Sequence, residues 1–93
     1  MRQIEEQGAF KRDYKRELKG RHRESLESSL VVAIAALAND LPLPSHYRDH
    51  ALIGNWRDHR DCHIKPDLVL IYRKVGTGSL HLVRLGSHAE LCL

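Results

Sequence analysis

Apolar residues recur at helical spacing in the first half of the chain. Between residues 9 and 19, Phe10, Tyr14 and Leu18 come at every fourth position and form one apolar stripe, which predicts a helix. A longer pattern of the same kind covers about residues 23–38. Its apolar face consists of Leu26, Leu30, Ala33, Ile34, Leu37 and Ala38. We therefore expect two consecutive helices, and the alanines of the second allow close packing on a sheet.

The ends of both patterns carry residues that stop a helix. Gly20 is predicted to cap the first helix, because glycine enters the left-handed region freely. Pro42 and Pro44 follow the second helix and cannot continue its hydrogen bonds, so residues 41–48 are expected to form an extended loop. Residues 1–7 precede both helices and predict a short edge strand.

From about residue 51 the pattern changes to one typical of strands. Residues 56–64 alternate between two faces, which predicts a strand. One face would hold Arg57, His59, Asp61 and His63. Cys62 belongs to the opposite face, and we expect it to be a core residue beneath a helix.

The remaining strands follow with short connections. Residues 65–67 contain a proline and predict a tight turn. Residues 68–72 are apolar at every position, which indicates a central strand covered on both faces. After a glycine-rich turn at 76–78, residues 80–85 form the last predicted strand, with Leu80, Leu82 and Arg84 spaced to share one face. The predicted fold is α+β: two N-terminal helices packed on a small, mostly antiparallel sheet.

Length and composition limit the class of protein. The 93 residues suit one domain spanning 1–93, since domains commonly hold about 100–150 residues. No apolar stretch approaches the roughly 20 residues of a membrane span, and the N-terminus lacks the apolar core of a signal peptide. The two cysteines form no disulfide framework. A cytoplasmic location, with no membrane contact, is the expectation.

Positive charge is concentrated in one segment. Residues 11–23 contain seven Lys or Arg against two Asp or Glu, whereas the whole chain has a net charge of only +3. A solvated helix face is the ordinary explanation for such a run. A local positive field also suits a phosphate backbone, and the candidate contacts are Lys11, Arg12, Lys15, Arg16 and Lys19.

Ionisable residues gather at the predicted strand ends. His63 and Asp67 flank the turn before the buried strand, with partial burial expected to raise the pKa of Asp67. His50 precedes them, and Arg84 and His88 follow. Histidines can act as acid and base near neutral pH, and arginine can stabilise charge on phosphate. Together these residues match the requirements of a ribonuclease that needs no metal or other cofactor.

Other uses of the same residues remain open. Each of them taken alone fits an ordinary surface, turn or cross-strand role. His59, Asp61 and His63 at alternate positions could hold zinc on one strand face, although no thiolate supports such a site. Asp61 could instead pair with Arg84 or Arg60 and hold the sheet together.

The sequence resembles a known family of bacterial toxins. The matching motifs are LPLP at 41–44, YRDH at 47–50, LIGNW at 52–56, RDCHIKPD at 60–67, LIY at 70–72 and RLGSHAEL at 84–91. They are similar to the RelE/ParE superfamily, and within it to the YafQ-type mRNA interferases. The block from 41 to 72 is the most specific part, whereas residues 1–40 match only in pattern.

The resemblance implies a microbial-ribonuclease-like fold and a ribosome-dependent endoribonuclease that cuts mRNA in the A site. It implies an antitoxin partner that binds the toxin and, with it, represses their operon through operator DNA. The family's functional residues correspond to His50, His63, Asp67, Arg84 and His88. His88 would be the general acid, and the base would be Asp67, His50 or His63. The basic residues of the first helix would contact ribosomal RNA.

Two positions depart from the family pattern. Leu68 stands where such toxins often carry tryptophan, and Cys92 stands where an aromatic residue is expected to stack on a base. Stacking contributes about 1–3 kcal/mol per base, so slower cleavage or a different codon preference is expected. The alternatives are a gyrase-poisoning toxin of the ParE branch, and a catalytically weak homologue that mainly binds antitoxin and operator DNA.

Overall fold

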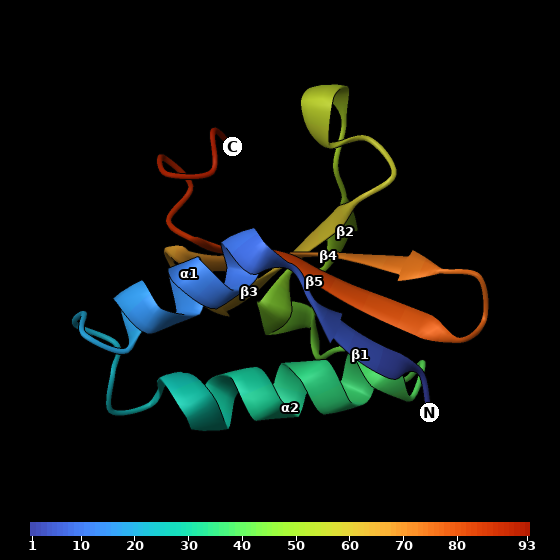
Figure 1. The fold of residues 1–93 in the computed structure, drawn as a ribbon, viewed down its shortest axis with the longest axis horizontal. Coiled ribbons are helices and arrows are strands. Elements are labelled where there is room, and N and C mark those ends of the chain that lie inside the picture. The colour runs from blue at the N-terminus through green and yellow to red at the C-terminus, as the bar shows by residue number, and fades with distance from the viewer.

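The computed structural model describes all 93 residues. It contains five strands, two α-helices and two short 3₁₀-helices (Figure 1). In chain order these are β1 (Gln3–Glu6), α1 (Gly8–Glu17), α2 (Leu26–Ala38), the 3₁₀-helix Ser45–Tyr47, β2 (His50–Ala51), the 3₁₀-helix Gly54–Trp56, β3 (Arg60–Lys65), β4 (Leu68–Val75) and β5 (Ser79–Gly86). The sheet order is β1-β5-β4-β3-β2, with β1 parallel to β5 and the other pairs antiparallel. The predicted α+β fold and the central position of β4 are confirmed.

One face of the sheet packs on α2. In Figure 1 the helix runs along this face, and the predicted apolar stripe of α2 is buried there. The stripe meets the residues of β3, β4 and β5 that face it: Cys62, Ile64, Leu68, Leu70, Tyr72, Leu80, Leu82 and Leu85. Cys62 is a fully buried core residue, as expected, and burial raises the pKa of its thiol to about 12. This layer contains the main hydrophobic core.

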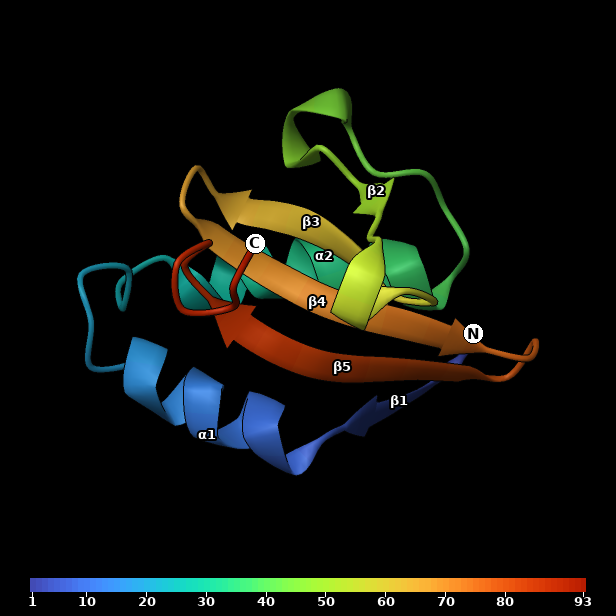
Figure 2. The ribbon, with the colours of Figure 1, turned by 90° about the horizontal axis from the view of Figure 1, so that it is seen from above.

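Helix α1 lies along the edge of β5 rather than over the sheet (Figure 2). Strand β1 pairs with β5 only as far as Leu82, which leaves the outer edge of β5 without a strand partner beyond that residue. Side chains of α1 take that place. Leu85 N donates to Asp13 Oδ2 at 2.9 Å, and Arg16 Nη2 donates to Leu85 O at 2.9 Å. Both main-chain groups of Leu85 are thereby satisfied, as buried backbone groups require.

The opposite face carries a smaller apolar cluster. Val69 and Ile71 of β4 pack there against Leu91, with Trp56 at the side. The C-terminal segment passes over β4 in Figure 2, and Trp56 Nε1 donates to Leu91 O at 3.2 Å. This contact ties the last residues of the chain to the loop between β2 and β3, so both segments border the same face.

Several predicted boundaries are wrong. Helix α1 ends at Glu17, and Gly20 is not its cap, because the chain leaves the helix through a right-handed turn in which Gly20 N donates to Glu17 O at 3.0 Å. The strand predicted from residue 56 begins at Arg60, since residues 54–59 form a 3₁₀-helix and a turn with Asp58 at a φ of 69°. The loop 41–48 is also not fully extended, since it includes a 3₁₀ turn.

A bulge changes the last strand. The register between β4 and β5 shifts between Ile71 and Tyr72, so that Tyr72 pairs with Leu82 and Ile71 pairs with Arg84. Val83 is the additional residue, and Leu85 takes the core position after Leu82. Arg84 therefore does not share a face with Leu80 and Leu82 as the spacing predicted. No helix of the structure is both long and apolar enough to span a membrane.

Candidate active site

Three of the candidate residues project from the face opposite α2. Residues paired across neighbouring strands share a face of the sheet. His50 pairs with Asp61, Asp61 with Ile71, and Ile71 with Arg84, which makes one row across β2, β3, β4 and β5. In the next row His63 pairs with Val69. The sheet register thus places His50, Asp61 and His63 on adjacent strands of one surface.

The turn before β4 and the C-terminal segment complete the cluster. Asp67 lies in the turn after β3, and His88 follows the end of β5. Asp67 Oδ1 accepts from His88 Nδ1 at 2.7 Å and from the His88 main-chain N–H at 3.2 Å. The ring of His88 meets that of His63 edge to face, with centroids 4.9 Å apart. With Nδ1 held by Asp67, His88 has Nε2 free for a substrate atom.

His50 is held by two oxygen atoms. Its Nδ1 is 2.7 Å from the carbonyl oxygen of Arg48 and 3.1 Å from Asp61 Oδ1. A carbonyl only accepts, so His50 Nδ1 carries the hydrogen and Nε2 is left free. That hydrogen is directed at Arg48, and Asp61 Oδ1 consequently has no hydrogen-bond partner although it is buried.

Asp61 is the electrostatic centre of the cluster. Only 2% of it is exposed, and burial raises its pKa, while the positive charges available on His50, His63 and His88 act in the opposite direction. A buried carboxylate without a hydrogen bond is unusual in a protein interior. The combination of burial, a raised pKa and nearby histidines is typical of a functional site.

The pKa values of His63 and Asp67 are both lowered. For His63 the main cause is burial, and the charges of His88, Arg48 and His50 add to it, against the attraction of Asp61. For Asp67 the cause is hydrogen bonding from the side chain and the main chain of His88. The expected increase in the pKa of Asp67 is therefore wrong, because this carboxylate is half exposed and hydrogen-bonded rather than desolvated.

Arg84 is separated from the histidines by the width of β4. Its Nε donates to Asp13 Oδ2 at 2.7 Å, and its Nη2 donates to Asp13 Oδ1 at 3.3 Å. Its partner is thus a carboxylate of α1, neither Asp61 nor a residue of a neighbouring strand. Arg60 likewise pairs with Asp49 and not with Asp61. The structure brings His63, Asp67 and His88 into contact, places His50 on the wall of the same pocket as His88, and leaves Arg84 at the side of that group.

The zinc arrangement considered from the sequence does not form. His59 lies before β3, where its Nδ1 is 3.1 Å from Arg57 O and its ring meets Trp56 edge to face. It therefore does not share a strand face with Asp61 and His63. No three side chains of His, Cys, Asp or Glu gather in a geometry that could hold a metal ion.

A pocket of about 420 Å³ opens beside the histidines. Its polar wall includes His50, Asp61 and His88, and its apolar wall includes Leu52 and Trp56. Cys92 lines the pocket as well, so this position does adjoin the histidines. A flat apolar group such as a nucleobase fits the chemistry of this wall.

Comparison with known proteins identifies the family. The family described as "Bacterial toxin of type II toxin-antitoxin system, YafQ" matches residues 2–93. The chain belongs to the YafQ family. The mRNA interferase toxin YafQ of Escherichia coli strain K12 is 39% identical over 90 residues, which cover 97% of this chain and 95% of that protein.

Solved structures agree with the YafQ assignment. A crystal structure of YafQ from Escherichia coli matches with a TM-score of 0.83 at 37% identity, covering 98% of both chains. The complex of DinJ with YafQ from the same organism matches with a TM-score of 0.82 at 39% identity, again covering 98% of both chains. The resemblance inferred from the motifs is confirmed, and the chain is a toxin of a type II toxin–antitoxin system.

The structure adds one residue to the predicted site, and it places one of the two positions that depart from the family pattern in the core. Asp61 was considered only as a zinc ligand or a sheet-pairing residue, yet it lies at the centre of the site. Its position inside a buried strand, two residues before His63, was the available signal. Leu68 is only 1% exposed and packs beneath α2, so its departure from tryptophan concerns the core and not the surface of the site.

Proposed function

We propose that the protein is a ribosome-dependent endoribonuclease that cleaves mRNA in the A site by acid–base chemistry. The observation that carries the proposal is the contact between His63 and His88, with Asp67 holding His88. Two histidines that present ring nitrogens to one surface supply an acid and a base to the same bond. The relative described as an mRNA interferase toxin supports the choice of substrate.

The arrangement favours His63 as the base and His88 as the acid. The lowered pKa of His63 keeps its ring neutral near pH 7, which is the form that accepts a proton. His63 would take the proton of the 2′-hydroxyl, and the 2′-oxygen would attack phosphorus. The bond to the 5′-oxygen would break as that oxygen takes a proton from His88. The products would be a 2′,3′-cyclic phosphate and a 5′-hydroxyl.

The other groups have supporting roles in this proposal. Asp67 would orient His88, since its hydrogen bonds and lowered pKa make it a poor base. His50 is the alternative base, because its Nε2 is free. Arg84 is held by Asp13 through Nε and Nη2, and its Nη1 would remain to donate to a phosphate oxygen.

Partners follow from the same proposal. The complex of DinJ with YafQ supports a protein antitoxin as the inhibitor of this chain, with operator DNA bound through that antitoxin. Lys11, Arg12 and Lys15 on α1, and Lys19 in the turn after it, are exposed and would contact ribosomal RNA. Arg16 is less available, because it pairs with Asp13, Glu17 and Glu90. The site of action would be the cytoplasm.

The proposal is tested by expressing the wild type, His88→Ala and His63→Ala in a bacterium. Loss of a general acid or base typically slows cleavage by about 10²–10⁴-fold, so both variants should leave mRNA intact and growth normal. Arg73→Gln, on the exposed outer part of β4, is the matched control and should remain toxic. Equal mRNA integrity with wild type and His88→Ala would reject the ribonuclease, and DNA damage signalling by all variants would indicate gyrase poisoning. Tight antitoxin binding by a wild type that leaves translated mRNA intact would indicate a catalytically weak homologue.

A further inference from the structure

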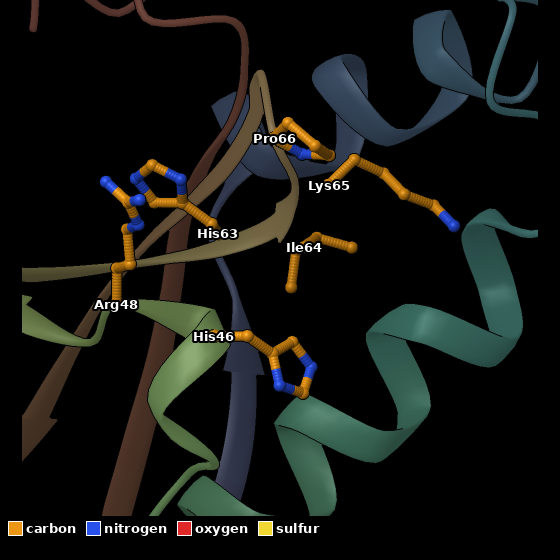
Figure 3. A pocket seen from close by; sticks show the side chains of 6 residues that line it. All are labelled: His46, Arg48, His63, Ile64, Lys65 and Pro66. Carbon is orange, nitrogen blue, oxygen red and sulfur yellow. The ribbon is translucent and has the colours of Figure 1, made fainter.

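A second concave surface adjoins the active site on its other side. It is a groove of about 500 Å³, and its wall contains one histidine of the active site. The lining residues are His46, Arg48, His63, Ile64, Lys65 and Pro66 (Figure 3). No carboxylate lines it, and Ile64 is its one hydrophobic side chain. The groove therefore offers hydrogen-bond donors and positive charge beside the carbon atoms of the same side chains.

The cations of this groove have no partners within the protein. Five cations elsewhere in the protein are held by carboxylates, namely Arg2, Arg16, Arg60, Lys74 and Arg84, and the other unpaired cations lie on the exposed surface. Arg48 and Lys65 form no ion pair, and their side chains donate no hydrogen bond within the protein, although both line a concave surface. Unpaired cations that converge on a groove are the chemistry expected for an anionic ligand.

The backbone at Arg48 is fixed in an uncommon conformation. Its φ of 51° and ψ of 43° lie in the left-handed region, which residues other than glycine seldom adopt. Arg48 N donates to Ser45 O at 3.0 Å, and Arg48 O accepts from His50 Nδ1 at 2.7 Å. In Figure 3 the guanidinium of Arg48 lies beside the ring of His63. The main chain of Arg48 thus orients His50, and its side chain places a positive charge next to His63.

The edge of β3 that borders the groove is poorly suited to a peptide strand. Strand β2 pairs only with Arg60 and Asp61, so the end of β3 is open. That end carries Lys65 and is followed by Pro66, and both residue types discourage strand pairing at a sheet edge. A protein segment would also need partners for large apolar anchors, and Ile64 is the one hydrophobic residue of the lining. A chain of phosphates needs only the cations.

We propose that this groove binds the sugar–phosphate backbone of the mRNA next to the scissile bond, with Arg48 and Lys65 contacting its phosphates. The inference rests on the proposed ribonuclease function, since it extends the same RNA strand beyond His63. His46, on the opposite wall of the groove, donates a hydrogen bond to the same sugar–phosphate backbone. Binding there aligns the strand with His63 and His88, so the groove sets affinity and register rather than the chemical step.

The test measures binding without cleavage. The probe is a hexaribonucleotide with 2′-O-methyl groups, which cannot form the 2′-oxyanion, titrated into the protein while backbone amide signals are followed by NMR. In the wild type the shifts should gather at residues 46–48 and 63–65. Arg48→Gln and Lys65→Gln should each weaken binding and lower the slope of log K against log salt by about 0.7 for each lost phosphate contact. Arg48→Lys should keep the slope, and Arg73→Gln should change neither quantity.

The groove proposal and the ribonuclease proposal predict different results, so each can fail without the other. In cleavage of ribosome-bound mRNA, Lys65→Gln should raise KM and leave kcat unchanged. The groove proposal is overturned if both groove variants bind the RNA with wild-type affinity and salt slope. It is also overturned if the wild type does not bind the RNA at all, even where the wild type cleaves mRNA. Equal or tighter binding of a hexaglutamate peptide at the same residues would also overturn it, in favour of an acidic protein segment. If the RNA binds as expected but the wild type cuts no translated mRNA, only the ribonuclease proposal fails.

Discussion

Two buried aspartates on opposite sides of β4 have contrasting environments. Asp13 is 3% exposed and Asp61 is 2% exposed, so both carboxylates have lost nearly all contact with water. Asp13 accepts hydrogen bonds from Arg16, Arg84 and the main chain of Leu85. Asp61 forms an ion-pair contact only with His50, and its Oδ1 lacks a hydrogen bond.

The pKa values of the two groups move in opposite directions. Burial disfavours the charged form of Asp13, but the hydrogen bonds from Arg84 and Leu85 outweigh it and lower the pKa. For Asp61 burial outweighs the attraction of the nearby histidines, and its pKa is raised. Asp13 therefore stabilises the attachment of α1 to β5, whereas Asp61 costs stability and places negative charge among the histidines. The contrast predicts a structural role for Asp13 and a functional one for Asp61.

The largest expected effect is the loss of Asp13. Asp13→Asn leaves the guanidinium of Arg84 without its partner at a partly buried site, and breaking a buried ion pair costs about 3–5 kcal/mol. The free energy of unfolding, measured by urea denaturation, should fall by about this amount. Asp40→Asn is the matched control, because Asp40 forms exposed ion pairs with Arg2 and Lys74 and should change the midpoint little. Similar small losses in both variants would contradict the structural role of Asp13.

A smaller effect, on activity rather than stability, is expected at Asp61. Asp61→Asn removes the charge that favours protonated His63, so the pKa of His63 falls further and the ring becomes a weaker base. We expect cleavage of translated mRNA to slow by about tenfold, within the usual range for acid–base groups. The free energy of unfolding should rise, or change by less than about 1 kcal/mol. An inactive variant that is also as unstable as Asp13→Asn would show that Asp61 is structural after all.

The smallest effect is the pH dependence of stability. Asp13 has a pKa below its ordinary 3.8, so its contribution is complete above that pH and is lost as the pH falls through the folded-state value. Asp61 has a pKa above 3.8, so its cost is present near neutral pH and is relieved as the pH falls through the raised value. Thermal unfolding is measured between pH 3 and pH 7 at about half-unit steps. The pH dependence of stability that each aspartate causes should disappear in its own Asn variant. A slope that persists in its own variant would assign it to another group.

Much of the fold is readable from the sequence because its signals are local. The helical stripe of residues 26–38 and the fully apolar stretch from 68 to 72 correspond to buried elements of the structure. The bulge at Val83 is different, because the spacing of Leu80 and Leu82 continues through Arg84 and nothing local marks the additional residue. The end of α1 was also missed, since a right-handed turn after Glu17 needs no glycine.

The sequence predicted that several of the candidate residues would lie near one another, but not which contacts they would make. His50, His63, Asp67 and His88 stand near strand ends and turns, and the register brings them together. The pairing of Arg84 with Asp13 joins residues 71 positions apart, which no local pattern reveals. The depth of Asp61 depends on the segments that cover its face, and therefore its raised pKa could not be inferred from strand alternation.

The central claim is that His88 protonates the 5′-oxygen while His63 acts as base. The most direct measurement uses ribosome-bound mRNA in which sulfur replaces the bridging 5′-oxygen at the cleavage site. A thiol has a pKa of about 8.5, far below that of an alcohol, so it leaves without an acid. Single-turnover cleavage of this substrate by His88→Ala should return to nearly the wild-type rate, while His63→Ala should stay slow. No recovery by His88→Ala, or equal recovery by both variants, would contradict the assignment.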